Sequence, residues 1–130
     1  MTVDGFRAVV GAGTLRPADG VAFPHRWTDE GVTVDADFTG AHLLHLAAAG
    51  CVLNDLYREA AQLGLVLQGV RVAAEGGFDK DSWTSTGITY AVEIASAAPR
   101  DEIDRLLAAV DEVAEIPRAL RAGTSVARVP

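Results

Sequence analysis

The chain has few of the residues and patterns on which several protein classes depend. It contains one cysteine, Cys51, in 130 residues, which excludes an internal disulfide framework and favours a reducing compartment. Its apolar stretches are interrupted by charged residues well before the ~18 residues that a membrane-spanning helix needs. The first residues lack the basic segment and apolar run of a secretory signal. We therefore expect a cytoplasmic protein with no membrane partner.

Positive charge is also scarce. The 11 Lys and Arg residues face 18 Asp and Glu residues, which gives a formal net charge of −7. Nucleic acids and anionic membrane surfaces bind basic patches, so neither is an expected partner. Apolar residues make up 49% of the sequence, enough for a hydrophobic core. The length is that of one domain, and residues 1–130 are predicted to form it.

Motifs of common catalytic and cofactor sites are absent or incomplete. No Gly-x-Ser-x-Gly occurs, so a serine hydrolase is unsupported. The Gly11-Ala-Gly13 stretch lacks the third glycine of a dinucleotide-binding loop, because Arg16 stands in its place. His42 and His45 are spaced to share a metal on a helix, but Cys51 falls on another side of that helix. We interpret both histidines as packing or capping residues and predict no cofactor and no metal.

What the sequence does contain is a long helical pattern between Thr39 and Gly64. The Thr39 hydroxyl can cap the first free amides of a helix, and Gly64 can adopt the left-handed conformation that often follows a helix end. The run from Ala41 to Leu53 is apolar on nearly every side. One small sheet can cover only part of such a helix, so we expect a second copy of the chain to cover the rest in a symmetric dimer.

Cys51 falls on a line of polar side chains along the second half of this helix. Arg58 lies two turns further on, where its guanidinium can approach the sulfur and favour the reactive thiolate. Asp55, one turn on, would oppose that effect or hold the arginine in place. The alternative interpretation is that Cys51 is a small apolar residue packed beside Ala47 and Ala48, as unpaired cysteines usually are.

Patterns of alternating apolar residues predict strands on both sides of the long helix, and a second amphipathic helix follows Pro99 and ends at Pro117. The predicted strands span residues 6–10, 21–27, 32–38, 66–75, 88–95 and 125–129. The expected order is therefore β-β-β-α-β-β-α-β. Paired strands with helices between the pairs are typical of an α+β fold with a mainly antiparallel sheet.

The stretch from Leu43 to Cys51, Leu-Leu-His-Leu-Ala-Ala-Ala-Gly-Cys, resembles the OsmC/Ohr family of osmotically inducible and organic hydroperoxide resistance proteins. The resemblance extends through the strand at Leu67 to Val72 and the helix end at Ile116-Pro117, from about residue 30 onward. It implies an intertwined homodimer in which sheets from both subunits wrap two central long helices. In active members a cysteine of the long helix attacks a hydroperoxide and becomes a sulfenic acid. A second cysteine then forms a disulfide with it, which a dithiol reductant opens.

By this resemblance Cys51 matches the attacking cysteine. Ile116 stands where the second cysteine normally precedes the proline, and Ala41 stands where the family has a glutamate that, with an arginine, holds the thiolate and substrate. That arginine corresponds to Arg7 or Arg16, of which Arg16, in a turn after a strand, is the better match. The candidate catalytic residues are Cys51, Arg16 and Arg58.

Two hypotheses follow for the function. In the first, the protein is a one-cysteine thiol enzyme that reduces an organic hydroperoxide and is regenerated by a small external thiol or through a Cys51 to Cys51 bridge across the dimer. In the second, it is a non-catalytic dimer that keeps the fold and binds a small apolar ligand or a partner. The missing second thiol slightly favours the second hypothesis over an efficient peroxidase.

Overall fold

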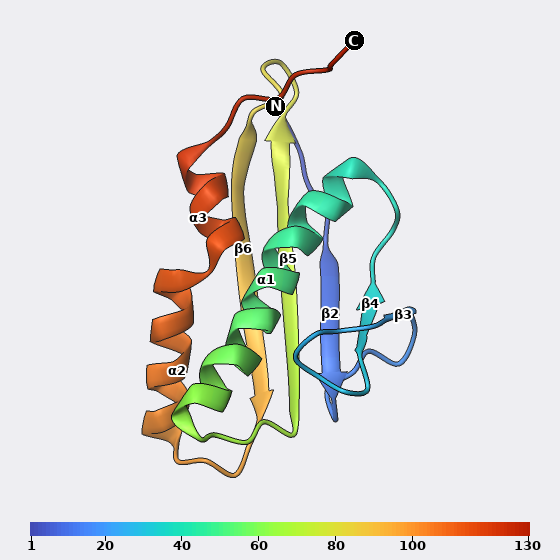
Figure 1. Ribbon diagram of the computed structural model, residues 1–130. Coiled ribbons are helices and arrows are strands. Elements are labelled where there is room, and N and C mark those ends of the chain that lie inside the picture. Colours follow the sequence, from blue (N-terminus) through green and yellow to red (C-terminus); the bar gives the residue numbers. More distant parts are fainter.

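The computed structural model describes residues 1–130 as an antiparallel sheet with all of its long helices on one face (Figure 1). Its elements are β1 Thr2–Val3, β2 Ala8–Gly13, β3 Val21–Phe23, β4 Val32–Asp35, α1 Gly40–Leu63, β5 Gly69–Asp79, β6 Ser85–Ala95, α2 Arg100–Val113 and α3 Glu115–Ala122. The strand order is β1-β5-β2-β4-β3, and β6 pairs with β5 along its other edge. No helix combines the length and the apolar character that crossing a membrane would require.

Helix α1 begins and ends where the sequence predicts. The Thr39 hydroxyl accepts a hydrogen bond from the His42 backbone N–H at 3.1 Å, and Gly64 has a φ of 72° in the left-handed region. The helix crosses the front of the sheet diagonally (Figure 1). There it buries Leu53 and Leu56 against the sheet, in one core with Val72 and other apolar residues of β2 and β5. The two predicted caps of α1 are therefore confirmed.

Helix α2 also agrees with the predicted start. Pro99 precedes its first residue, and Asp101 and Glu102 occupy the first turn, where the positive end of the helix dipole favours acidic side chains. The helix buries Leu106 and Val110 completely against α1. Figure 1 shows α2 and α3 following one another along the β6 side of the sheet. This arrangement brings the start of α3 against the middle of α1.

The end of the chain differs from the predicted order. Residues 125–129 form no strand and are exposed, and a third helix stands before them, so the observed order is β-β-β-β-α-β-β-α-α. Pro117, predicted to end α2, is the third residue of α3. A proline is compatible with the first turn of a helix because its missing N–H has no partner there. The alternating apolar pattern of residues 125–129 does not produce a strand, because no sheet edge pairs with these residues.

The strand boundaries also differ from the predicted ones. The first predicted strand, residues 6–10, corresponds to β2, which begins and ends later, and the short strand β1 before Gly5 was not predicted. Strand β3 ends at Phe23, because Pro24 has no N–H to donate to a ladder. Strand β5 begins and ends later than the predicted residues 66–75, and it carries a register shift between Gly76 and Phe78. The α+β class and the antiparallel pairing are as predicted.

Candidate functional site

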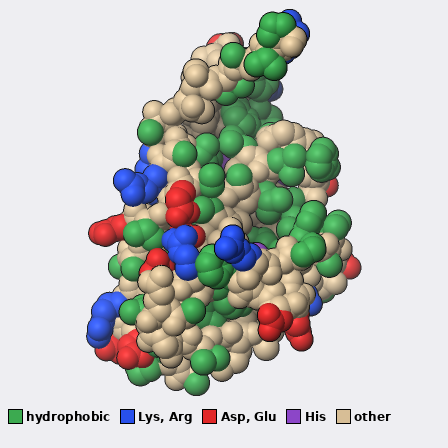
Figure 2. Space-filling model, viewed as in Figure 1, with side chains coloured by type: hydrophobic (Ala, Val, Ile, Leu, Met, Phe, Trp, Pro, Cys, Tyr) green, Lys and Arg blue, Asp and Glu red, His purple; other side chains and the backbone are tan.

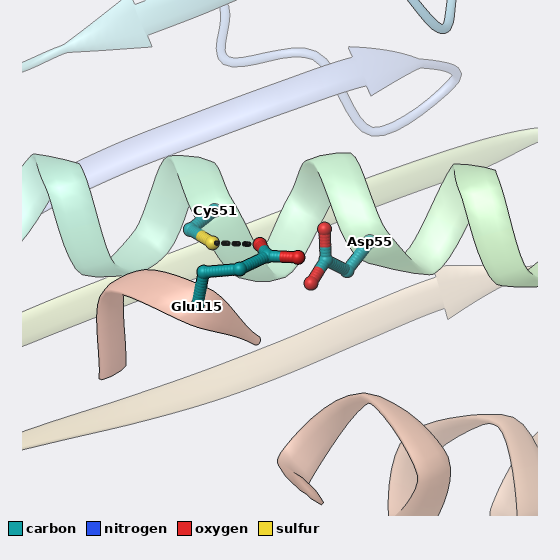
Figure 3. A group of neighbouring side chains, drawn as sticks. All are labelled: Cys51, Asp55 and Glu115. Carbon is teal, nitrogen blue, oxygen red and sulfur yellow. Dashed lines mark hydrogen bonds between the residues drawn. The ribbon is translucent and has the colours of Figure 1, made fainter. Parts of the chain in front are cut away.

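The Cys51 side chain lies in the contact between α1 and the start of α3. It is 7% exposed and belongs to the same core as Val52 and Leu53. Its Sγ–H donates to Oε2 of Glu115 at 3.4 Å, and its sulfur accepts the Ile116 backbone N–H at 3.5 Å. Figure 3 shows the thiol directed at the Glu115 carboxyl, with Asp55 on the far side of that carboxyl. Both partners of the sulfur therefore come from α3.

Glu115 reaches Cys51 because the chain breaks its helix at Ala114. That residue has a φ of −59° and a ψ of 116°, so α2 stops and α3 starts in a new direction with Glu115 as its first residue. A carboxylate at a helix start benefits from the free backbone amides there. Its own backbone N–H, the Cys51 thiol and the Arg58 guanidinium hold the pKa of Glu115 below its ordinary value.

The Arg58 guanidinium is surrounded by carboxylates. Its nitrogens lie 3.2 Å from Glu115 Oε1, 3.2 Å from Asp55 Oδ2 and 3.6 Å from Glu59 Oε1. It forms no hydrogen bond with the Cys51 sulfur. The structure thus joins Cys51 to Arg58 through Glu115, in contrast to the direct approach expected from the helical spacing.

Burial and the local charges shift Cys51 and Asp55 toward their protonated forms. Burial raises the pKa of the Cys51 thiol, and the charges of Asp55 and Glu115 add to this effect, while the Ile116 N–H opposes it. Burial also raises the pKa of Asp55 to about 6, against the attraction of Arg58. Asp55 is only 2% exposed. The resting sulfur is therefore a thiol.

Arg16, the third candidate, lies elsewhere in the chain. It follows β2, with Nη2 3.9 Å from Glu30 Oε2 and its backbone carbonyl bound by Arg71. Burial raises the pKa of Tyr57, and the charge of Arg16 opposes this rise only in part. Within one chain Arg16 makes no hydrogen bond or ion pair with Cys51. The structure therefore brings together Cys51 and Arg58, through Glu115, and leaves Arg16 apart from them.

An apolar cavity of about 240 Å³ is lined by neighbours of the cluster in the sequence but by none of its own residues. It lies between α1, β6 and α3 and includes Ala48, one turn before Cys51, and Pro117, which follows Ile116. The remaining lining residues are Leu44, Ser85, Gly87, Ile88, Tyr90, Leu120 and Arg121. A small organic molecule placed there would contact Ala48 and Pro117, but Cys51 itself does not line the cavity.

The two histidines of α1 take the structural roles predicted for them. The His42 ring and backbone both contact the Thr39 hydroxyl at the helix start. His45 is completely buried, bonds the Ala41 carbonyl through Nδ1 at 2.6 Å and packs against Phe78. Neither histidine belongs to the Cys51 cluster.

Glu115 is the site residue that the sequence analysis missed. The acidic residues near the end of the second predicted helix have no periodic feature that distinguishes them from a solvated face. The signal that does exist is Pro117, two residues after Glu115. A proline in the first turn of a helix would have marked a new helix start, with Glu115 as its first residue.

The matches found by comparison with known proteins span most of this chain. The model of a family described as OsmC-like protein matches residues 32–127. No curated protein matches the sequence. Among solved structures, an OsmC-like hydroperoxide resistance protein from Jannaschia sp. CCS1 has a TM-score of 0.58 at 13% identity, covering 94% of this chain and 91% of that chain. At this identity the structural likeness shows a shared fold, and it confirms the OsmC-like fold expected from the residues before Cys51.

Proposed function

Because the chain belongs to the OsmC-like protein family, we propose that it reduces organic hydroperoxides with Cys51 as its single reacting thiol. The observation that carries the proposal is the connection from Cys51 through Glu115 to Arg58, with separations of 3.4 Å and 3.2 Å. A thiol, a carboxylate that can take its proton, and an arginine that fixes the carboxylate are the groups that activation of a nucleophile requires.

This connection supplies a carboxylate in place of the glutamate that is absent at position 41. Ala41 stands where the family resemblance leads us to expect a glutamate beside an arginine. Glu115 brings a carboxylate to the sulfur from the opposite end of the chain, and Arg58 brings a guanidinium from two turns along α1. The site thus has a carboxylate and a guanidinium, but at other sequence positions than the family resemblance leads us to expect. The substitution at position 41 is therefore no argument against thiol chemistry.

The first step follows from the geometry. Glu115 Oε2 accepts the thiol proton, and the Ile116 N–H together with the start of α3 stabilises the thiolate formed. The sulfur attacks the terminal oxygen of the hydroperoxide, the O–O bond breaks, and the alcohol leaves with the proton returned by Glu115. Sulfur loses two electrons and becomes a sulfenic acid, while the peroxide is reduced.

Regeneration requires a reductant from outside the chain, because Cys51 is the only cysteine. A small thiol attacks the sulfenic acid, releasing water and leaving a mixed disulfide. A second small thiol attacks this mixed disulfide, forms the external disulfide and restores the Cys51 thiol. The partners of the reaction are thus an organic hydroperoxide and a small thiol reductant.

The adjoining cavity supports an organic substrate. Its walls are mainly the apolar side chains of Leu44, Ile88 and Leu120, and Arg121 stands among them. An alkyl or aryl group placed in this cavity would displace water from apolar surface, which favours binding. A small peroxide without such a group gains nothing from it. We therefore expect larger apolar hydroperoxides to react faster than hydrogen peroxide.

We further propose that the protein acts as a homodimer. Figure 2 shows apolar side chains at the upper right of the displayed face, over the first half of α1 and the β3–β4 pair, while charged side chains gather mainly to the left. Phe38, just before α1, is 88% exposed, and Leu43 and Leu46 are only partly buried. Exposed apolar surface of this kind is typical of an interaction face.

The second candidate function is non-catalytic binding of a small apolar ligand in the same cavity. The buried thiol and its raised pKa favour this alternative, because a protonated sulfur is a weak nucleophile. The two functions differ in one measurable respect. Only the first consumes peroxide in proportion to the enzyme and depends on Cys51.

The test is consumption of tert-butyl hydroperoxide with a small thiol as reductant. We expect Cys51→Ser to lose the activity and Glu115→Gln to lower it by roughly 100-fold, the usual effect of removing a general base. Glu112→Gln is the matched control, because this exposed carboxylate of α2 contacts none of the cluster. A Cys51→Ser variant as fast as the natural protein would overturn the proposal and leave ligand binding as the function.

A further inference from the structure

Three ligand-type side chains converge at the α1–α3 contact. The Cys51 sulfur and one carboxylate oxygen each from Asp55 and Glu115 all lie within 4.8 Å of one another (Figure 3). Cys51 and Asp55 are one turn apart on α1, so the helix itself fixes their spacing. Glu115 faces them from α3. Sulfur and carboxylate donors of this kind are ligands of zinc.

The Asp55 carboxylate is the independent sign that this cluster lacks a partner. It is 2% exposed, and its fully buried Oδ2 accepts no hydrogen bond, although Arg58 lies near enough to form an ion pair with it. Buried carboxylates normally accept hydrogen bonds, since burying such a group without them is unfavourable. The nearest cation, Arg58, lies 3.2 Å from Oδ2 but is shared with Glu59 and Glu115. Three carboxylates thus surround one guanidinium, and the cluster keeps an excess of negative charge.

We propose that Cys51, Asp55 and Glu115 bind a divalent cation of the zinc class, with water as the fourth ligand. Zinc bonds of about 2.3 Å to sulfur and 2.0 to 2.2 Å to oxygen place tetrahedral sulfur and oxygen ligands about 3.5 Å apart. The separation of Cys51 Sγ and Glu115 Oε2 is 3.4 Å. Binding releases the thiol proton, and the cation then neutralises the three ligands together with Arg58.

The cation can reach the site from the α3 side. The Glu115 side chain is 62% exposed, whereas Cys51 and Asp55 are buried on α1. Two ligands are thus buried on α1 and the third lies at the surface. A bound cation would occupy the sulfur that attacks the peroxide, so it would block the proposed reaction reversibly. Cation binding itself needs only the three ligands and does not depend on the proposed function.

Binding is tested by competition between the full-length metal-free protein and a chromophoric zinc chelator, and by adding Co²⁺ as a spectroscopic probe. We expect one cation per chain, and a sulfur-to-cobalt charge-transfer band that Cys51→Ser removes. Asp55→Asn should lower zinc affinity by more than the ~10–100-fold that loss of an outer-shell group causes. Glu59→Gln is the matched control, since it removes a carboxylate from the same arginine but not from the ligand set.

Each result decides the matter. A natural protein without the cobalt band, or an Asp55→Asn variant that binds zinc as tightly as Glu59→Gln, would overturn the inference. Unfolding curves of the variants show that any loss of binding is not a loss of folding. Peroxide consumption by the metal-free protein is a separate measurement, so the failure of zinc binding and the failure of the proposed peroxidase are distinguishable.

Discussion

The Cys51 thiol illustrates how a single residue can be placed for chemistry yet kept protonated. Burial and the neighbouring charges of Asp55 and Glu115 raise its pKa. Because alkylating reagents react with the thiolate, we expect the native protein to need a higher pH for half-maximal alkylation than the urea-unfolded protein. The measurement is the rate of iodoacetamide labelling against pH, followed by mass. A native midpoint at or below the unfolded one would contradict this electrostatic account.

Glu115→Gln separates two roles of one carboxylate. The negative charge and hydrogen bond of Glu115 raise the Cys51 pKa, so their removal should shift the alkylation midpoint to lower pH and speed labelling near neutrality. The same change should slow peroxide reduction, because no carboxyl group remains to return the proton to the leaving alcohol. Opposite changes in the two rates would indicate that Glu115 returns the proton during peroxide reduction. Slowing of both would mean that Glu115→Gln merely disorders the site, and Glu112→Gln should change neither.

Asp55 should make stability depend on pH. Its pKa is raised from 3.8 to about 6 in the fold, so the folded protein binds the proton more tightly than the unfolded chain does. Stability from this group is therefore greatest below pH 4 and is lost as the pH rises through 6, by on the order of 2 to 3 kcal/mol. We expect Asp55→Asn to be more stable than the natural protein at pH 7.5 and to lose this dependence. Urea unfolding between pH 4 and 7.5 measures this dependence of stability on pH. An Asp55→Asn variant that is less stable than the natural protein at pH 7.5 would contradict the prediction.

At the scale of the element, α1 depends on its first turn. The Thr39 hydroxyl accepts the His42 N–H and also contacts the His42 ring, at 3.1 Å and 2.6 Å. Thr39→Ala removes this cap, and we expect a loss of about 1 kcal/mol in the free energy of unfolding. Thr124→Ala, in the exposed tail, is the control and should have no effect. Urea unfolding at constant pH compares them, and equal stabilities would show that the first turn is frayed.

Local signals explain why some elements could be predicted and others could not. The caps of α1 and the start of α2 at Pro99 are set by residues within a few positions of each boundary, and all are as predicted. The break at Ala114 has only one local signal, Pro117, which suits the first turn of a new helix as well as the end of the preceding one. The predicted strand at residues 125–129 failed because pairing depends on a free sheet edge, which no local pattern reports.

The residues of the candidate site also include some that local helical spacing places and one that it does not. Cys51, Asp55 and Arg58 share one helix, so helical spacing alone places them on neighbouring lines. Glu115 is 64 residues from Cys51 and arrives only because α3 turns back on α1. Because Glu115 lies between them, Arg58 binds carboxylates and is connected to the sulfur only through Glu115. Helical periodicity can identify candidate residues on one helix. It cannot show which charged residue of another helix will lie between them.

At the scale of the whole molecule, the helices cover the sheet unevenly. Helices α2 and α3 lie along the β6 side, and the first half of α1 has no helix beside it on the β4 side (Figure 1). The apolar residues there remain partly exposed, with Phe38 at 88% and Phe23 at 50%. A second copy of the chain placed on this face would bury them. Specific interfaces bury roughly 800 Å² on each partner, so the proposed dimer contact would have to include both the β3 side and the start of α1.

The last prediction tests this dimer without disturbing the fold. Phe38 is so exposed that Phe38→Glu removes almost no packing within the chain, but it would place a charge in the apolar face that we assign to the partner. We expect sedimentation velocity to give twice the 13.6 kDa mass for the natural protein and a shift toward the monomer for Phe38→Glu. Val66→Glu is the matched control, because Val66 is 70% exposed but lies beyond the opposite end of α1. A monomeric natural protein would refute the dimer, and equal effects of the two variants would place the interface elsewhere.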